Sequence, residues 1–418
     1  MSQRITPQQI PQVLQAAEQA ANRGNLVFAE GMMRDCLDMG LNHPGLHHML
    51  ARIALSVDAF GPAADNMRNL QRTLPTPDPE ISTTIAALEQ RAADQRRELS
   101  AHPRYMLIRA WGCGFCSDVD HVLGCLLLAE ATGRTPIVRW GQESLFCDQG
   151  VDNAWPRFFE PVSSLTYDQL PKADLWPPKW NADTLLGPRL NWDTGEWSRV
   201  QYMKYFARPE ETVVMDYMCR VPSVLPWLPA SHPLKGASPA AAFRTLVAKY
   251  LRPVPEVAAA AAEFFTRHLS PGPAIAVHIR GSDKTAEDPA LEAGNTALRE
   301  GVIALARQRA GAKIFLLTDS TRELSAMRAA LGDRVVATPS LRTGGDVGLH
   351  HMPEQNRTKL GREVMIDMYI AAMCNALIGP GNSNVSCLID HLRDWPAGSV
   401  KFQIPNFQLS RNYFGYNW

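Results

Sequence analysis

The sequence lacks an excess of charge of either sign. Lysine and arginine total 42 residues, aspartate and glutamate also total 42, and the formal net charge is zero. A neutral chain has no overall attraction for nucleic acid or for an anionic membrane surface, so any anion-binding site must be local. We therefore expect no nucleic-acid partner.

Long apolar runs and a cysteine framework are also lacking. No run approaches the roughly 20 apolar residues that a membrane-spanning helix needs, and residues 1–7 contain no apolar signal core. The eight cysteines are scattered through 418 residues, unlike the dense cysteines of a small disulfide-bonded domain. These absences predict a cytoplasmic protein with no membrane span.

The chain does have enough apolar residues, 45% of the total, for large cores, and its length predicts two or three domains. Residues 1–100 have helical periodicity and form the first predicted domain. Three apolar positions recur there after 34 residues, the period of a tetratricopeptide repeat: Ala29, Met33 and Cys36 return as Ala63, Met67 and Leu70. An ordinary helical bundle is an equally open interpretation, because fewer than three repeats are present.

Residues 101–270 form the second predicted domain. Residues 105–110 are typical of a strand, residues 118–131 of a helix, and residues 137–138 begin another strand. This order is a βαβ unit, which predicts a parallel sheet. Residues 150–235 are rich in tryptophan, proline and tyrosine and have little periodicity, so we expect long loops around an open cleft on the acceptor side.

Residues 271–418 form the third predicted domain, with strands expected at 274–279, 313–317 and 376–378 and helices between them. The predicted fold class is therefore α/β, with two Rossmann-like domains that face a cleft. They follow an all-helical N-terminal domain, for which a tetratricopeptide-like array and an ordinary bundle are the two alternatives.

Two predicted strands of the third domain end in residues suited to an anion. The first ends in Arg280, followed by Asp283 and Lys284, and a fixed guanidinium at a strand end suits a phosphate as well as it suits a surface salt bridge. The second ends in a glycine-rich turn, where the free N–H groups of the next helix favour an anion: Asn382, Ser383 and Asn384. Ser383 or Asn384 could also cap that helix. Two such strand ends together favour a nucleotide phosphate.

Two acids of this domain are further candidates. Asp319 ends the strand 313–317 and is expected to orient donor or acceptor hydroxyls, or to cap a helix. Asp367 lies among apolar neighbours on a helix, where an acid is unfavourable without a partner. A buried structural ion pair is the alternative for Asp367.

The turn after the first strand of the second domain contains Gly112 and Gly114, which are expected to let a ligand approach. Cys113 and Cys116 in the same turn resemble a thiol–disulfide motif, and Asp118 with Asp120 could bind a metal ion. We favour a capping box from Ser117 to Asp120 over both, and expect no metal.

An ordered set of residues resembles the fucosyltransferase superfamily: His278, Arg280, Asp283 and Lys284, then Thr318 and Asp319, then Val364 and Asp367, then 382–385. The set looks closest to the α1,6-fucosyltransferases, which include the bacterial nodulation enzymes, and is more distantly similar to protein O-fucosyltransferases. It covers residues 274 to about 390. Residues 104–150 have only a general likeness, and residues 1–100 have none.

The resemblance implies a GT-B fold with GDP-fucose bound mainly by the third domain, an inverting reaction, and no metal or other cofactor. It implies that Arg280 holds the β-phosphate of the donor with Ser383 beside it, and that His278 and Asp367 contact the nucleoside. A preorganised cation fits this role because negative charge builds on the leaving diphosphate.

The chain departs from the family pattern at two places. Gly281 stands where the α1,6 enzymes usually have a second arginine, so one phosphate contact is expected to be missing. The family's candidate base glutamate corresponds to Asp288, with Glu287 one residue earlier. A base must accept the proton of the acceptor hydroxyl, and we favour Glu287 for its longer reach.

These observations predict a glycosyltransferase that moves fucose from GDP-fucose, or a related GDP-sugar, to a glycan or protein acceptor. The helical domain is expected to bind the acceptor, a protein partner or a second subunit. Two alternatives stay open: a metal-dependent glycosyltransferase built on Asp118 and Asp120, and a non-catalytic scaffold that contains repeats.

Overall fold

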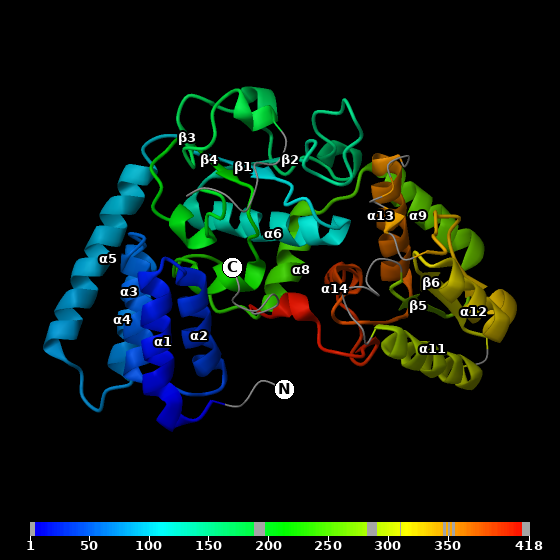
Figure 1. The fold of residues 1–418 in the computed structure, drawn as a ribbon, viewed down its shortest axis with the longest axis horizontal. Coiled ribbons are helices and arrows are strands. Elements are labelled where there is room, and N and C mark those ends of the chain that lie inside the picture. Colours follow the sequence, from blue (N-terminus) through cyan, green and yellow to red (C-terminus); the bar gives the residue numbers. More distant parts are fainter. Residues whose placement is uncertain are drawn as a thin grey trace.

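The computed structural model describes residues 5–187, 197–281, 291–309, 311–345, 348–349, 352 and 356–411. Three parts follow one another along its long axis: a group of helices, a first sheet with its helices, and a second sheet with its helices (Figure 1). The α/β class with two parallel sheets, predicted from the sequence, is confirmed. The predicted domain boundaries at 100 and 270 stay predictions.

Five helices form the N-terminal part: α1 (Ile10–Asn22), α2 (Leu26–Asp38), α3 (Pro44–Leu55), α4 (Phe60–Arg72) and α5 (Pro79–Leu99). Local caps explain where some of them begin. The side chain of Asn25 accepts a hydrogen bond from the Phe28 amide at the start of α2, and Asp78 caps α5 just before Pro79. The positions that recur after 34 residues face the core of this bundle, since Ala29, Met33, Cys36, Ala63 and Leu70 are buried.

The first sheet contains β1 (Tyr105–Arg109), β2 (Thr135–Arg139), β3 (Leu175–Trp176) and β4 (Thr212–Met215) in the order β2-β1-β4-β3, all parallel. Helix α6 (Phe115–Thr132) joins β1 to β2, which confirms the predicted βαβ unit. The short helix α7 (Val221–Val224) and the longer helices α8 (Pro239–Tyr250) and α9 (Pro255–His268) follow β4.

The described residues of the segment 150–235 are largely irregular, as expected for long loops, while the open cleft on the acceptor side stays a prediction. The segment supplies β3 and β4 to the first sheet, and its large aromatic side chains pack inside the protein. Trp155, Trp176, Trp180 and Trp227 are all at most 3% exposed. The tryptophans therefore build the core of this domain, because an irregular segment without helical or strand periodicity needs large side chains to bury enough apolar area.

The second sheet contains β5 (Ala274–His278), β6 (Lys313–Leu317), β7 (Val335–Val336), β8 (Ala376–Gly379) and β9 (Val400–Phe402) in the order β7-β6-β5-β8-β9. All of these neighbours are parallel. The helices of this domain are α11 (Leu291–Gln308), α12 (Thr321–Leu331), α13 (Arg357–Met373) and α14 (Asn384–His391). Strand order reverses direction between β5 and β8, and ligands of open α/β sheets bind at such a reversal.

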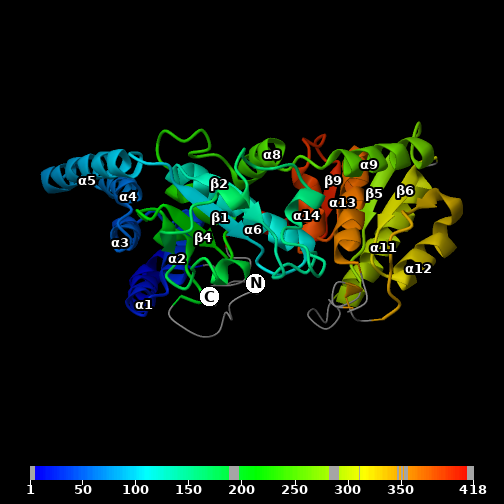
Figure 2. The same ribbon diagram turned by 90° about the horizontal axis from the view of Figure 1, so that it is seen from above.

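The two sheet domains meet through the start of α6, which packs near α13 and α14 (Figure 2). Cys116 Sγ in its first turn lies 3.3 Å from Met368 Sδ of α13. The chain then returns to the first domain after β9, where the guanidinium of Arg220 donates to the backbone oxygens of Phe407 and Ser410. Within the described ranges, no helix is long and apolar enough to cross a membrane.

A buried carboxylate joins the helical part to the first sheet domain. Glu30 of α2 is 4% exposed and accepts hydrogen bonds from the indole of Trp227 at 2.5 Å and from the Tyr202 hydroxyl. It also pairs with Arg34 at 2.5 Å. Burial, with the Glu30 charge adding to it, holds the pKa of Tyr202 well above its usual range, so the phenol stays protonated and donates.

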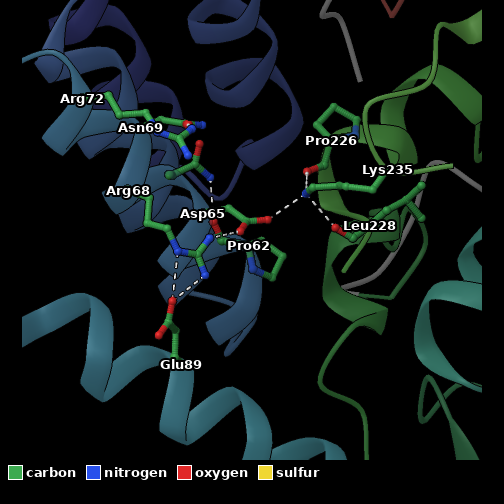
Figure 3. A network of polar contacts seen from close by, with 10 residues as sticks. Pro62, Asp65, Arg68, Asn69, Arg72, Glu89, Pro226, Leu228 and Lys235 are labelled. Atoms are coloured by element: carbon green, nitrogen blue, oxygen red, sulfur yellow. Dashed lines mark hydrogen bonds and ion pairs between the residues drawn. The ribbon is translucent and has the colours of Figure 1, made fainter. Parts of the chain in front are cut away.

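A second link between the same two parts is closer to solvent. Lys235 donates to Asp65 of α4 at 2.7 Å and also to two backbone oxygens, those of Pro226 and Leu228 (Figure 3). Arg68 bridges Asp65 to Glu89 of α5. Lys235 would keep its backbone acceptors if Asp65 were removed.

We expect Glu30→Ala to lower the free energy of unfolding by about 3 kcal/mol or more, because it leaves buried donors without an acceptor. Asp65→Ala is the matched control. It should lower the free energy of unfolding by no more than about 1 kcal/mol, because the ion pair between Asp65 and Lys235 is partly exposed. Urea denaturation of both variants measures the difference. Equal losses would show that the buried carboxylate does not anchor the helical part.

Candidate active site

The carboxyl ends of four neighbouring strands of the second sheet lie along one edge. Because the strands are parallel, the residues that follow them share that edge. Thr338 follows β7, Asp319 follows β6 and Arg280 follows β5, while β8 runs into the glycine-rich turn before Ser383. Most of the candidates singled out from the sequence of this domain are thus brought together, and β5 and β8 flank the reversal of strand order.

His278 is buried at the end of β5 and links that strand to α14. Its Nδ1 lies 2.7 Å from the Ser386 hydroxyl. A Cβ added at Gly379 would lie 2.8 Å from Ser386 Oγ and 3.4 Å from His278 Cβ, so glycine permits this close approach. Burial, together with the nearby charge of Arg280, lowers the pKa of His278 to about 3. The imidazole is therefore neutral at physiological pH.

The turn that contains Arg280 is held at two points. Asp319 Oδ1 accepts a hydrogen bond from the Gly281 amide at 3.0 Å, and the Asn295 side chain donates to the Arg280 carbonyl at 2.6 Å. Asp319 does not cap α12, because Ser320 occupies the N-cap position and accepts from the Glu323 amide. The carboxylate of Asp319 thus positions the backbone beside Arg280.

The guanidinium of Arg280 lies near enough to the first domain to act on Cys116. Burial raises the pKa of the Cys116 thiol in α6, and the nearby guanidinium of Arg280 acts in the opposite direction. In the part of the chain that the structure describes, no residue forms an ion pair with Arg280 within 4.0 Å. The cation therefore lies where the two domains meet.

The arginine at the equivalent place in the first sheet has a different environment. Arg109 ends β1, is 1% exposed, and donates to both carboxylate oxygens of Glu143 at 3.2 and 2.8 Å. It also donates to the Gly187 carbonyl. A buried, neutralised guanidinium of this kind supports structure, whereas Arg280 is half-buried and suited to a ligand.

The structure gives a physical reason for the glycine at 281. A Cβ at this position would lie 2.6 Å from Ser320 Cβ and 3.0 Å from Asp319 Oδ1. The end of β5 is therefore packed too closely against β6 for a second arginine in this turn. Close packing against Ser320 and Asp319 therefore explains why this chain has glycine at position 281.

We expect Gly281→Ala to lower the free energy of unfolding by about 1–3 kcal/mol through overpacking against Ser320. Ser320→Gly alone should cost only a few tenths of a kcal/mol, because glycine is tolerated at an N-cap. The double variant should regain most of the loss, as measured by urea denaturation. A double variant no more stable than Gly281→Ala would refute this explanation.

The glycine-rich turn leads into α14 without a side-chain cap. Ser383 is at the N-cap position and is buried, but its side chain makes no capping hydrogen bond. Asn384 Oδ1 instead accepts from the Gln408 side chain at 2.9 Å, and Asn382 is half-buried. The capping alternative for Ser383 and Asn384 is therefore wrong, and the first turn of α14 keeps its free N–H groups.

Asp367 of α13 lies in a polar pocket beside the loop that follows β7. Its Oδ1 accepts from the Thr338 hydroxyl at 2.6 Å. Burial raises the pKa of Asp367 to about 7, against the opposing effects of the Thr338 hydrogen bond and the Arg342 charge. Its hydrogen bond is to a hydroxyl, and no cation of the described chain lies within 4.0 Å of it, so the structural ion pair is not formed.

The turn after β1 differs from the predicted capping box. Helix α6 begins at Phe115 with Gly114 as N-cap, so Ser117 lies inside the helix and the capping box is wrong. Asp118 Oδ1 accepts from the Cys113 amide at 3.1 Å instead. A Cβ at Gly114 would meet no atom within 4 Å, so this glycine leaves room on the surface, whereas Gly112 has a φ of 83°, a backbone conformation that favours glycine.

The structural roles of this turn do not favour the metal or redox alternatives. Asp120 pairs with Arg220, Nε to Oδ2, at 3.1 Å, while Asp118 bonds to the turn. Among the residues that the structure describes, no three acids, histidines or cysteines are arranged to hold a metal ion. The raised pKa of Cys116 is opposite to what a thiol–disulfide enzyme needs.

Four predicted site residues lie outside the described residues: Asp283, Lys284, Glu287 and Asp288. Sequence reasoning in turn missed Asn295, Thr338, Arg342 and Ser386. Thr338 and Arg342 follow a strand, so applying the strand-end rule to β7 would have found them. Asn295 and Ser386 had no local signal, because their partners lie far away in the chain.

No protein-family model matches the chain. The curated nodulation protein Z of Bradyrhizobium diazoefficiens is 24% identical over 318 residues, which cover 72% of this chain and 82% of that protein. The predicted resemblance to fucosyltransferases is confirmed. The aligned length exceeds the second sheet domain, so the similarity extends beyond the residues that first suggested it.

Two solved structures are also similar. The fucosyltransferase NodZ from Bradyrhizobium is 21% identical, with a TM-score of 0.46, over 69% of this chain and 92% of that chain. POFUT1 in complex with GDP is 14% identical, with a TM-score of 0.43, over 72% of this chain and 99% of that chain. The fold itself is defined by the strand order and register described above.

Proposed function

We propose that this chain is a glycosyltransferase that transfers fucose from GDP-fucose to a glycan or protein acceptor, with inversion and without a metal ion. The observation that carries the proposal is the position of Arg280, a positioned arginine at the reversal of strand order in the second sheet. The similarity to nodulation protein Z supports fucose transfer as the chemistry.

The proposed role of Arg280 is to bind the β-phosphate and stabilise the leaving diphosphate. Negative charge grows on that group as the sugar–phosphate bond breaks, and a cation fixed beforehand lowers this barrier. The free N–H groups of α14, next to Ser383, would add partial positive charge at the same place. The neutral His278 holds α14 against β5 through Ser386 and adds no competing charge.

The proposed base is Glu287, with Asp288 as its alternative, acting on the acceptor hydroxyl. Asp283, Lys284, Asn382 and Asn384 are proposed donor-binding residues. The acceptor would approach from the first domain, past Gly112 and Gly114, and a Cβ at Gly114 would meet no atom within 4 Å. A protein partner of the helical part stays a proposal.

Arg280→Ala should lower turnover by about 100- to 1,000-fold, because one preorganised electrostatic contact to the developing charge is lost. Release of GDP from GDP-fucose measures turnover. Arg322→Ala is the matched control, since Arg322 is an exposed arginine of the same domain paired with Glu292. Retained turnover in Arg280→Ala would overturn the assignment of Arg280.

The same assay separates the two alternatives. Turnover should survive treatment with a chelator, whereas a metal-dependent transferase using Asp118 and Asp120 would lose it. A scaffold protein would bind no GDP at all, which calorimetry with the wild-type chain would reveal.

Donor affinity should fall as pH is lowered through about 7. The carboxyl of Asp367 can accept both N–H groups of guanine only when it is ionised. Burial raises the pKa of Asp367 to about 7. Affinity should therefore drop about tenfold from pH 8 to pH 6. GDP-fucose is the right probe, because its diphosphate carries no terminal phosphate that titrates in this range.

Asp367→Asn should bind more weakly but without this pH dependence, as measured by calorimetry at several pH values. His278 does not contribute a competing titration, since its pKa is about 3. A wild-type affinity that is flat between pH 6 and pH 8 would contradict the role given to Asp367.

A further inference from the structure

Arg342 has hydrogen-bond donors that the protein leaves unused. It lies in the loop after β7, where its Nη1 donates to the backbone oxygens of Thr338 at 3.0 Å and Ser340 at 2.7 Å. Its Nε and Nη2 are shielded from solvent and have no hydrogen-bond partner among the residues that the structure describes. Other buried arginine nitrogens, such as Nη1 of Arg109, also lack a partner among the described residues, so what distinguishes Arg342 is its place beside Asp367 at the edge of the second sheet.

The loop that carries Arg342 is fixed in place. The Thr343 amide donates to the Asp319 carbonyl at 2.8 Å, and the Thr321 amide donates to the Thr343 carbonyl at 2.9 Å. The Thr338 hydroxyl also lies 2.7 Å from the Ser340 hydroxyl. The guanidinium is therefore held at the same edge of the second sheet as Asp319 and Arg280.

Arg342 and Asp367 share one neighbour yet do not pair with each other. Thr338 donates its hydroxyl to Asp367 and accepts from Arg342 through its backbone oxygen. Each charge influences the other, but they form no ion pair within 4.0 Å. Arg342 and Asp367 would stabilise the fold by pairing directly. Their separation fits a ligand that accepts from the guanidinium and donates to the carboxylate.

Guanine has the complementary pattern. One edge carries the N1–H and N2–H donors that a carboxylate accepts, and another carries the O6 and N7 acceptors that an arginine binds bidentately. Adenine has a donor where guanine has O6, and pyrimidines lack N7, so each would leave donors of Arg342 unpaired.

We infer that Arg342 reads the O6 and N7 edge of the guanine base while Asp367 reads the opposite edge, so that Arg342 sets the nucleotide specificity of the donor site. This inference rests on the proposed function. Arg342, which the sequence analysis did not single out, would then discriminate against nucleotides with other bases.

The test compares GDP with 7-deaza-GDP, which lacks the N7 acceptor, by calorimetry on the full chain. Wild-type protein should bind 7-deaza-GDP at least fivefold more weakly than GDP. Arg342→Ala should bind GDP about 5- to 150-fold more weakly than wild type does, the range expected for one bidentate contact, and should bind the two nucleotides with nearly equal affinity.

Arg328→Ala is the matched control, because Arg328 is an exposed arginine whose charge also acts on Arg342. It removes a nearby charge without removing a base contact, so its preference for GDP over 7-deaza-GDP should match that of wild type. The wild-type comparison needs no variant and stands even if Arg342→Ala fails to fold.

Equal wild-type affinities for GDP and 7-deaza-GDP would overturn the inference and leave the proposed function intact. The inference would also be overturned if Arg342→Ala lowered the affinities for GDP and for 7-deaza-GDP by the same factor, since that result indicates a contact to phosphate. Absence of any GDP binding to wild-type protein would defeat the proposed function, and the inference with it.

Discussion

The hydrogen bond from the Gly281 amide to Asp319 is the constraint on which the candidate site depends. It ties the end of β5 to the end of β6 and leaves no space for a side chain at 281. The turn is also held from the other side by Asn295, which fixes the backbone at Arg280, and the guanidinium acts on Cys116 of the first domain. A cation fixed in this way can stabilise a leaving group without reorganisation at the moment of reaction.

The site has two poles that the second sheet places on one edge. Arg280 and the start of α14 lie at the proposed phosphate pole. Asp367, Thr338 and Arg342 lie at the proposed nucleobase pole on the other side of Asp319. The first domain reaches the phosphate pole through the turn before α6, where Cys116 contacts α13. The junction between the domains is therefore also where a sugar would pass from donor to acceptor.

Much of this arrangement could be predicted from the sequence, because it depends on local patterns. The βαβ unit, the strands around Arg280 and the glycine-rich turn all follow from short apolar runs that end in polar or glycine residues. The start of α6 was misplaced by three residues, since Asp118 bonds back to Cys113 where a Ser117 cap was expected.

The rest could not be predicted, because it depends on partners distant in the chain. Glu30 meets Trp227 and Tyr202 across domains, His278 meets Ser386, and the unused donors of Arg342 matter only beside Asp367. Composition alone also does not separate core tryptophans from those of a substrate surface. Four tryptophans of residues 150–235 lie in the core: Trp155, Trp176, Trp180 and Trp227.

A thermal-shift screen of the wild-type chain against GDP-fucose, UDP-sugars and CMP-sugars tests the central claim most directly. We expect GDP-fucose to raise the melting temperature more than any uridine or cytidine nucleotide does, because the stabilisation of the native state by a ligand grows with the logarithm of its concentration divided by its Kd. Preferential stabilisation by a nucleotide other than a guanine nucleotide would contradict it.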